Sequence, residues 1–372
     1  MGPLNGLAKL FLQQLDLGVK FAQIQQSILT FIKGHNLTLV EIVERLQKGY
    51  KGREYRKQFK VLSGFLYERF LECHDSKKAF AEYKAAAETE CPYGYLFVGI
   101  CYENGIGVHI DSEKAFKNYQ KSVEYSRNRP FPCGQYRLAR CYERGIGTSV
   151  NHEFAFNCYT RAANAGNLDA LNSLGCWYQK GKYVKQDFSE AYKNYKKAAD
   201  GGLPCAQFNV AEFLRLGCGV KKNELEAFHW YQTAANNGES SAQYWLAQHY
   251  EEDKNKNDKL ALKWYLKAAE ATQITEEIVQ TYYSLALIYD YGQLGVVRDD
   301  KKAFEWYQKA SDVGIIEATR RLSECYRRGL GTEIDLEKAN KLAKLISDTK
   351  ENEAEKKYRR ILSVSLSSIK TL

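Results

Sequence analysis

The chain has 372 residues, 44% of them hydrophobic and 27% charged, which is an ordinary composition for a protein with a large buried core. Its 54 Lys and Arg are interleaved with 45 Asp and Glu, so the net charge of +9 indicates a solvated surface and argues against a clustered nucleic-acid footprint. The sequence contains neither an apolar run of about 18 residues nor a secretory leader pattern, and therefore predicts no membrane span and a cytoplasmic location.

The leader, residues 1–54, does not share the repeat described below. Its apolar residues are roughly helically spaced at Leu7, Leu10, Phe11, Phe21, Ile24, Ile28 and Phe31. Residues 37–46 look like a further amphipathic helix. We expect the leader to be a helical cap, because the end of a repeat array must cover its open face. A helix that lies on a membrane surface is the alternative.

Residues 55–345 repeat a pattern in which the first helix, helix A, ends with an aromatic residue. This aromatic position holds Tyr102, Tyr142, Tyr178, Tyr250, Tyr289 and Tyr326, with Leu214 substituting once. A small residue stands three positions earlier, at Gly99, Ala139, Gly175, Ala211, Ala247, Ala286 and Ser323. Such a small residue lets two helices approach closely. A weaker copy at Gly64 and Tyr67 brings the number of repeats to eight.

A glycine turn follows helix A in several repeats, as in Gly105-Ile106-Gly107 and Gly145-Ile146-Gly147. Glycine just past a helix can adopt the left-handed conformation that closes it. A Gly-x-Gly turn can also hold a phosphate, but that motif follows a strand, and here the turn follows a helix and recurs in register. The pattern therefore favours the structural explanation.

The second helix, helix B, begins with a recurring Asp or Asn. These residues are Asp75, Asp111, Asn151, Asp187, Asn223, Asn257, Asp299 and Asp335. An alanine stands four positions later, with intervals of 34 to 42 residues between repeats, and in seven repeats a tyrosine follows after four more. Asp and Asn are favoured N-caps, because the side-chain oxygen accepts unpaired backbone N–H groups. Glu190 and Glu226 are placed to complete capping boxes.

The tail, residues 346–372, is expected to be a C-terminal capping helix or an extension. It contains a compact basic run at Lys356, Lys357, Arg359 and Arg360. This run resembles a nuclear-import patch, so the nucleus is a second possible location. The solvated face of a terminal helix is the favoured interpretation.

The combined pattern, as in Leu174-Gly175, Tyr178, Gly181, Asp187, Ala191 and Tyr195, resembles the Sel-one-like repeat (SLR) family over about residues 58–345. The resemblance implies an all-α fold, an α/α superhelical solenoid of about eight helix-turn-helix repeats like those of tetratricopeptide proteins. Members are scaffolds and adaptors, and the leader is similar to that of fungal members. A cysteine-rich bacterial branch carries a disulfide in each repeat; this chain has alanine at the helix B position of that disulfide.

We expect a scaffold or adaptor that binds a protein or peptide. The six histidines are scattered and the ten cysteines form no C-x-x-C pair, so the sequence predicts no enzyme activity, no catalytic residue, no cofactor, no metal and no small-molecule substrate. A nucleic-acid-binding helical repeat is an alternative, although the basic stripe that it needs is missing. A regulatory subunit of an enzyme complex at a membrane is a further alternative.

In related repeats the concave wall is built from helix A, on the face opposite the aromatic position. Positions six and two residues before the aromatic residue place eight candidates there: Tyr136, Arg140, Phe208, Glu212, Tyr244, Gln248, Tyr283 and Leu287. Aromatic anchors beside polar neighbours are typical of a peptide-binding surface. Alternatively, these rings pack between adjacent repeats, since an aromatic stripe at helical spacing is often core.

Overall fold

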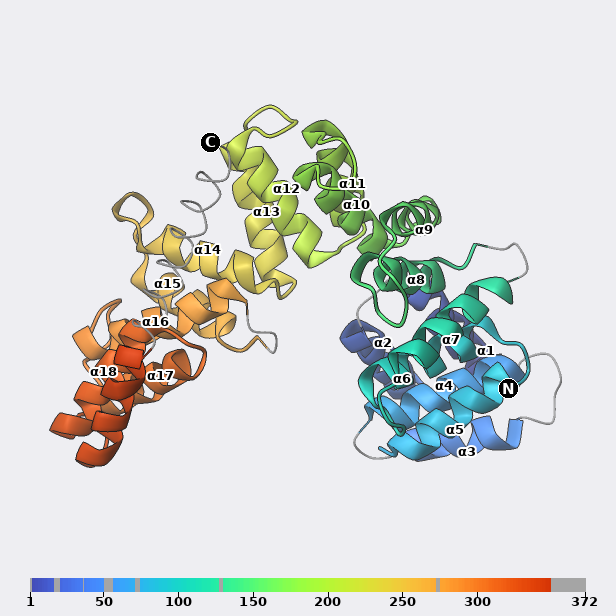
Figure 1. Cartoon of the computed structure of the whole chain (residues 1–372), viewed down its shortest axis with the longest axis horizontal. Helices are drawn as coiled ribbons and strands as arrows, with labels where there is room; N and C mark the ends of the chain where they lie inside the picture. The colour runs from blue at the N-terminus through green and yellow to red at the C-terminus, as the bar shows by residue number, and fades with distance from the viewer. Residues whose placement is uncertain are drawn as a thin grey trace, which may run out of the picture. The chain divides into compact units, whose positions relative to one another are not determined.

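A computed structural model describes residues 2–16, 21–35, 37–49, 56–70, 74–126, 130–271 and 275–348. The regular elements in these ranges are all helices, which confirms the all-α prediction (Figure 1). The chain divides into two compact units, Met1–Ala227 (unit 1) and Phe228–Leu372 (unit 2). The basic run at 356–360 and most of the predicted tail lie outside the described residues, and the predicted boundaries at residues 54 and 345 stay predictions.

Unit 1 contains a leader of three helices followed by stacked helix pairs. Its helices are α1 (Gly2–Asp16), α2 (Phe21–Gly34), α3 (Leu39–Gly49), α4 (Arg56–Arg69), α5 (Ser76–Ala87), α6 (Pro92–Asn104), α7 (Ser112–Glu124), α8 (Pro132–Arg144), α9 (His152–Asn164), α10 (Leu168–Lys180), α11 (Phe188–Asp200), α12 (Pro204–Leu216) and the first residues of α13 (Glu224–Asn236). The pairs α4–α5, α6–α7, α8–α9 and α10–α11 each pack together, and each pair contacts the next. This is the stacking of an α solenoid.

Unit 2 continues the same pattern. Its helices are the rest of α13, α14 (Ser240–Glu251), the 3₁₀ turn η2 (Asp253–Asn255), α15 (Asp258–Ala268), α16 (Glu276–Tyr291), α17 (Asp300–Asp312), α18 (Ile316–Arg328) and a last helix, residues 336–348. The pairs α14–α15 and α16–α17 pack together, and α18 packs on α17.

The predicted small residue of helix A lies under the buried tyrosine of helix B. A Cβ added to Gly99 would stand 2.5 Å from the Tyr119 ring, and one added to Gly64 would stand 2.5 Å from the Tyr83 ring. The weak first copy, α4–α5, is therefore built like the others. The helix B tyrosines are among the largest fully buried side chains of the described residues: Tyr83, Tyr119, Tyr159, Tyr195, Tyr231, Tyr265 and Tyr307.

An acceptor for these buried tyrosines was missed by the sequence analysis. The residue directly after the helix A aromatic accepts the tyrosine hydroxyl in six repeats: Tyr83 to Glu68 (2.8 Å), Tyr119 to Glu103 (2.5 Å), Tyr159 to Glu143 (2.7 Å), Tyr195 to Gln179 (2.7 Å), Tyr265 to Glu251 (2.6 Å) and Tyr307 to Asp290 (2.8 Å). A buried hydroxyl without a partner is costly, so each tyrosine needs its acceptor. In the last repeat Ala343 replaces the tyrosine and Arg327 replaces the acid.

The two glycines of the turn have different structural roles. Gly105 closes α6 in the left-handed conformation, with φ +73°. Gly107 faces the preceding repeat, because its added Cβ would stand 2.1 Å from the carbonyl oxygen of Ser76. Gly147 meets Ser112 in the same way, at 2.0 Å. The second glycine therefore forms the seam between repeats, which supports the structural explanation of the motif.

All eight predicted N-caps are confirmed, since each side chain accepts the backbone N–H three residues later. The predicted capping boxes are wrong. The Asp187 N–H donates to the carbonyl of Tyr178 at 3.0 Å, and the Glu190 carboxylate accepts from Lys193 at 2.6 Å. Glu226 likewise accepts from the Asn223 side chain. The cap's own N–H is unavailable to the glutamate because it closes the turn onto helix A.

The leader packs on the first helix pairs. Phe11 of α1 is 1% exposed, and its ring centroid lies 4.8 Å from that of Phe65 on α4 and 6.2 Å from that of Phe97 on α6. Leu7, on the same face of α1, is also buried, whereas Leu10 is 40% exposed and does not belong to this face. Helix α3 packs on α4. The apolar face that a membrane-surface helix would need is thus packed against the repeats.

Candidate functional site

The helix-A wall consists of the residues six and two positions before the helix A aromatic. In unit 1 the wall residues are buried in some helices and partly exposed in others. In α4 and α6 the wall residues Val61, Phe65, Leu96 and Ile100 are buried and belong to the same hydrophobic core as Leu7 and Phe11 of α1. In α8 and α12 the predicted residues Tyr136, Arg140, Phe208 and Glu212 are only partly buried. The wall residues are therefore buried at α4 and α6 (the covered section) and partly exposed at α8 and α12 (the open section), although α1 also contacts α8.

The open wall of α8 is held by charged side chains. The Tyr136 ring leans on the buried Tyr159, with centroids 5.9 Å apart, and burial raises the pKa of Tyr136 to about 12. Arg140 lies 3.8 Å and its neighbour Arg137 3.4 Å from the carboxylate of Glu103, which also accepts the Tyr119 hydroxyl. These ion pairs join α6 to α8 and fix the arginines in place.

The open wall of α12 is more polar. The Glu212 carboxylate is paired with Arg215, one turn along the helix, at 2.6 Å. Asn209 donates to Asn172 of α10 at 3.0 Å, so a pair of amides bridges the wall between α10 and α12. Phe208 is the partly buried aromatic residue of this section.

Unit 2 carries the other four predicted residues. The Tyr244 ring lies 6.0 Å from Tyr265, and its hydroxyl accepts from the exposed Gln248 at 3.1 Å. The Tyr283 ring lies 6.3 Å from Tyr307, and Leu287 is partly buried. Burial raises the pKa of Tyr244 and of Tyr283 above the usual range. Each ring packs on a buried tyrosine of its own repeat and keeps part of its surface exposed, so peptide binding here stays a prediction.

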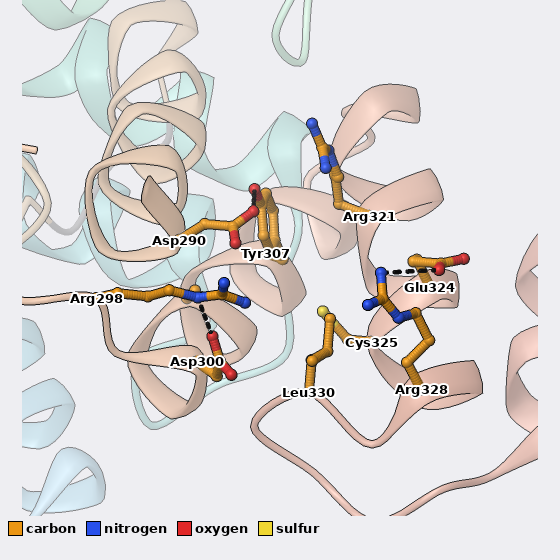
Figure 2. A pocket seen from close by; sticks show the side chains of 10 residues that line it. Asp290, Arg298, Asp300, Tyr307, Arg321, Glu324, Cys325, Arg328 and Leu330 are labelled. Carbon is orange, nitrogen blue, oxygen red and sulfur yellow. Dashed lines mark hydrogen bonds and ion pairs between the residues drawn. The ribbon is translucent and has the colours of Figure 1, made fainter. Parts of the chain in front are cut away.

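A cavity that the sequence analysis did not predict lies in unit 2 between α16, α17 and α18 (Figure 2). It measures about 210 Å³. It is lined by Asp290, Arg298, Asp300, Ala303, Tyr307, Arg321, Glu324, Cys325, Arg328 and Leu330. Two of its three arginines form internal ion pairs, Arg298 with Asp300 at 2.7 Å and Arg328 with Glu324 at 3.6 Å.

The described cysteines are buried or partly buried, whereas four of the six histidines are exposed. Every described cysteine is a free thiol. Burial raises the pKa of Cys141 to about 12 and that of Cys325 to about 11, as expected of inert packing residues. His249 packs between Phe228 and Trp245, and burial lowers its pKa. In the part of the chain that the structure describes, no group of His, Cys, Asp and Glu is arranged to hold a metal ion. Nor does this part contain a helix long and apolar enough to cross a membrane.

The chain was compared with known families and structures. The family model described as Sel1 repeat matches seven segments: 92–124, 134–167, 168–203, 206–239, 240–272, 279–314 and 316–348. A Sel1 repeat protein from Oxalobacter formigenes is 28% identical with a TM-score of 0.60, and the match covers 68% of this chain and 99% of that protein. A protective antigen of uropathogenic Escherichia coli with an SLR fold is 22% identical with a TM-score of 0.44, covering 91% of each chain.

A search of curated proteins found no significant match. The comparisons do not support a likeness to fungal members, so this stays a prediction. The seven family segments coincide with the helix pairs from α6 to the last helix, and α4–α5 adds an eighth pair of the same construction. By its repeats and its fold, the chain belongs to the Sel1 repeat family.

Proposed function

We propose that the chain is a scaffold or adaptor whose helix-A wall binds a helix or an extended segment of a partner protein. The observation that carries this proposal is the position of α1. Helices α4 and α6 already bind an amphipathic helix of the chain itself, with Phe11 packed against the wall residue Phe65 and against Phe97, which is next to the wall residue Leu96. Helix-in-groove recognition uses the same geometry when the helix belongs to another protein.

The open wall offers the side chains that such binding uses. Unit 1 presents Tyr136 and Phe208 as aromatic anchors, with Arg140 and Glu212 one turn away from them. Unit 2 presents Tyr244 and Tyr283, with Gln248 and Leu287 in the corresponding places. Aromatic residues and arginine dominate binding energy at protein interfaces. Binding of nucleic acid and attachment to an enzyme complex at a membrane are the competing outcomes.

The proposal includes the absence of an enzyme activity, a cofactor and a small-molecule substrate, and a place in the cytoplasm or the nucleus. It is supported by the roles that reactive side chains have in the described residues. His249 and Cys325 are packing residues, and the recurring aspartates are N-caps. Residues so engaged leave no evident nucleophile and base pair.

The test is a double substitution in unit 2, Tyr244→Ala with Tyr283→Ala, in the full chain. We expect a partner recovered by proximity labelling to bind at least about tenfold more weakly, since each lost aromatic anchor costs more than about 1 kcal/mol. The melting temperature should remain within a few degrees. The matched control is Trp230→Ala with Trp306→Ala, which removes two partly buried aromatics from helix B of the same unit.

A large fall in melting temperature for the tyrosine variant would show that these rings are core and that the site is misplaced. An equal loss of binding in the tryptophan control would place the partner on helix B instead. Binding abolished by moderate salt but unaffected by the double substitution would favour nucleic acid.

A further inference from the structure

The cavity of unit 2 lies at the seam between its last two repeats. In α10 and α12 of unit 1 the residue just before the helix A aromatic position is large and fills the seam, whereas α6 and α8 have Cys101 and Cys141 there. Trp177 donates its indole N–H to Glu143 at 2.8 Å, and the Phe213 ring lies 5.3 Å from that of Tyr195. The corresponding residue of α18 is Cys325. Its small side chain is one of the ten that line the space of about 210 Å³ (Figure 2).

The carboxylates around this cavity already have partners. Asp290 accepts the Tyr307 hydroxyl at 2.8 Å, Asp300 pairs with Arg298, and Glu324 pairs with Arg328. The lining thus carries three acidic and three basic side chains. The third guanidinium, Arg321, is the one that a carboxylate does not neutralise directly.

Arg321 donates to the neutral hydroxyl of Tyr291 at 2.5 Å and lies over that ring, 5.7 Å from its centroid. It forms no ion pair with a described carboxylate within 4.0 Å. Arg137 holds the same position in α8 and lies 3.4 Å from Glu103. The guanidinium has five N–H donors, and the single hydroxyl bond leaves most of them for a further acceptor.

We propose that this pocket binds a carboxylate, with Arg321 as the residue that recognises it. The planar guanidinium matches a carboxylate with two parallel hydrogen bonds. A phosphate group, with a charge of about −1.5 to −2, would be repelled by Asp290, Asp300 and Glu324 of the same lining more strongly than a singly charged carboxylate. The carboxylate comes from an acidic side chain of a bound partner or from a free small acid, and the first source rests on the proposed function.

The position of the pocket suits an acidic residue of a partner. Glu324 stands two residues before Tyr326, which is the wall position that Arg140 and Glu212 occupy in unit 1. Within unit 2 the pocket borders α16, the helix that carries Tyr283 and Leu287. A peptide held by Tyr283 could therefore extend an acidic side chain into the pocket.

The test measures binding to the full chain by isothermal titration calorimetry. The probes are glutarate, the capped peptide acetyl-Ala-Ala-Glu-Ala-Ala-amide, its Gln counterpart, and inorganic phosphate. We expect glutarate and the Glu peptide to bind, and the Gln peptide to bind at least about tenfold more weakly, as for the loss of a charge-assisted pair. Arg321→Gln should weaken both acidic probes by about tenfold or more. Arg321→Lys, which keeps the charge but not the planar pair of N–H donors, should give a smaller loss of affinity.

The control is Lys341→Gln, which removes the same charge from the last helix of unit 2, where Lys341 pairs with Glu337 at 2.6 Å. It should leave both affinities unchanged. Unchanged binding in Arg321→Gln, or phosphate bound more tightly than glutarate, would overturn the proposal. Arg321-dependent binding of glutarate without the Glu peptide would support the pocket and count against a protein source of the carboxylate. If the Tyr244→Ala, Tyr283→Ala variant still bound its partner, the proposed function would be wrong but glutarate binding would be unaffected. The two proposals can therefore fail separately.

Discussion

The covered and open sections of the helix-A wall in unit 1 are built from the same repeat and differ in what lies on them. At α4 and α6 the wall positions hold Val61, Phe65, Leu96 and Ile100, which are buried with the face of α1. At α8 and α12 they hold Tyr136, Arg140, Phe208 and Glu212, which are partly exposed. A surface that is always covered can be wholly apolar. A surface that is exposed to water whenever its partner is absent needs polar as well as apolar side chains. The difference indicates that α1 is a permanent part of the fold, and it leaves the mixed open section as the surface that we propose binds a partner.

The largest effect should come from the covered section. Phe11→Ala removes a ring that is 1% exposed and leaves a cavity between α1, α4 and α6, so we expect unit 1 to lose roughly 3 to 5 kcal/mol of unfolding free energy. Denaturant unfolding followed by Trp177 fluorescence measures it. Trp177 is the single tryptophan of unit 1, since the other four lie at positions 230, 245, 264 and 306.

The matched variant in the open section is Tyr136→Ala. Its ring is only partly buried, and we expect a loss of about 1 kcal/mol. Equal losses for the two variants would mean that the open wall is as much core as the covered wall.

An intermediate effect should be the same in both sections, because the seam between repeats does not involve the wall. In Gly107→Ala the new Cβ would stand 2.1 Å from the Ser76 carbonyl oxygen at φ +66°, and Gly147→Ala meets Ser112 at 2.0 Å. We expect roughly 2 to 4 kcal/mol of destabilisation for each, from the left-handed conformation and the overpacking together. Urea unfolding measures both.

Gly105→Ala is the control for the seam. It has the same left-handed backbone, but the nearest atom to its new Cβ is a side-chain carbon of Ile110 at 3.1 Å. It should cost only about 1 kcal/mol. A cost for Gly147→Ala near that of Gly105→Ala would show that the seam is looser in the open section.

The smallest effect concerns the caps. The backbone N–H of Lys114 holds the pKa of Asp111 below its usual value, and Asp75 is held low by Lys78 in the same way. A lowered folded pKa gives stability that is complete above the unfolded value of about 3.9 and is lost as pH falls through the folded value. Asp111→Asn keeps the acceptor oxygen and does not titrate. We therefore expect the wild type to lose more stability than this variant between about pH 4 and pH 2.5, by urea unfolding. Parallel curves would show that the cap does not depend on charge.

The repeat has further sequence signals besides its N-caps and small residues. In four repeats an N-cap aspartate is followed after three residues by a lysine that pairs with it and lies over the helix A tyrosine: Lys78, Lys114, Lys302 and Lys338. At Asn151 the corresponding residue is Phe154, whose ring stacks on Tyr142. The acid after the helix A aromatic recurs as regularly. Each of these signals recurs at a fixed position of the repeat, so the sequence could have predicted it.

The sequence by itself determined the helix pairs, their ends and the tyrosine seam of each repeat, because these depend on residues close together in the chain. It also defined the positions of the helix-A wall, whose role in binding stays a prediction. Only the tertiary structure decided what covers that wall, since Phe11 meets Phe97 across 85 intervening positions and no spacing rule specifies such a contact. Spacing also does not specify the hydrogen bond that the Asp187 N–H donates to the Tyr178 carbonyl, or the cavity beside Cys325. Each is set by how one helix approaches another, which is a property of packing and not of periodicity.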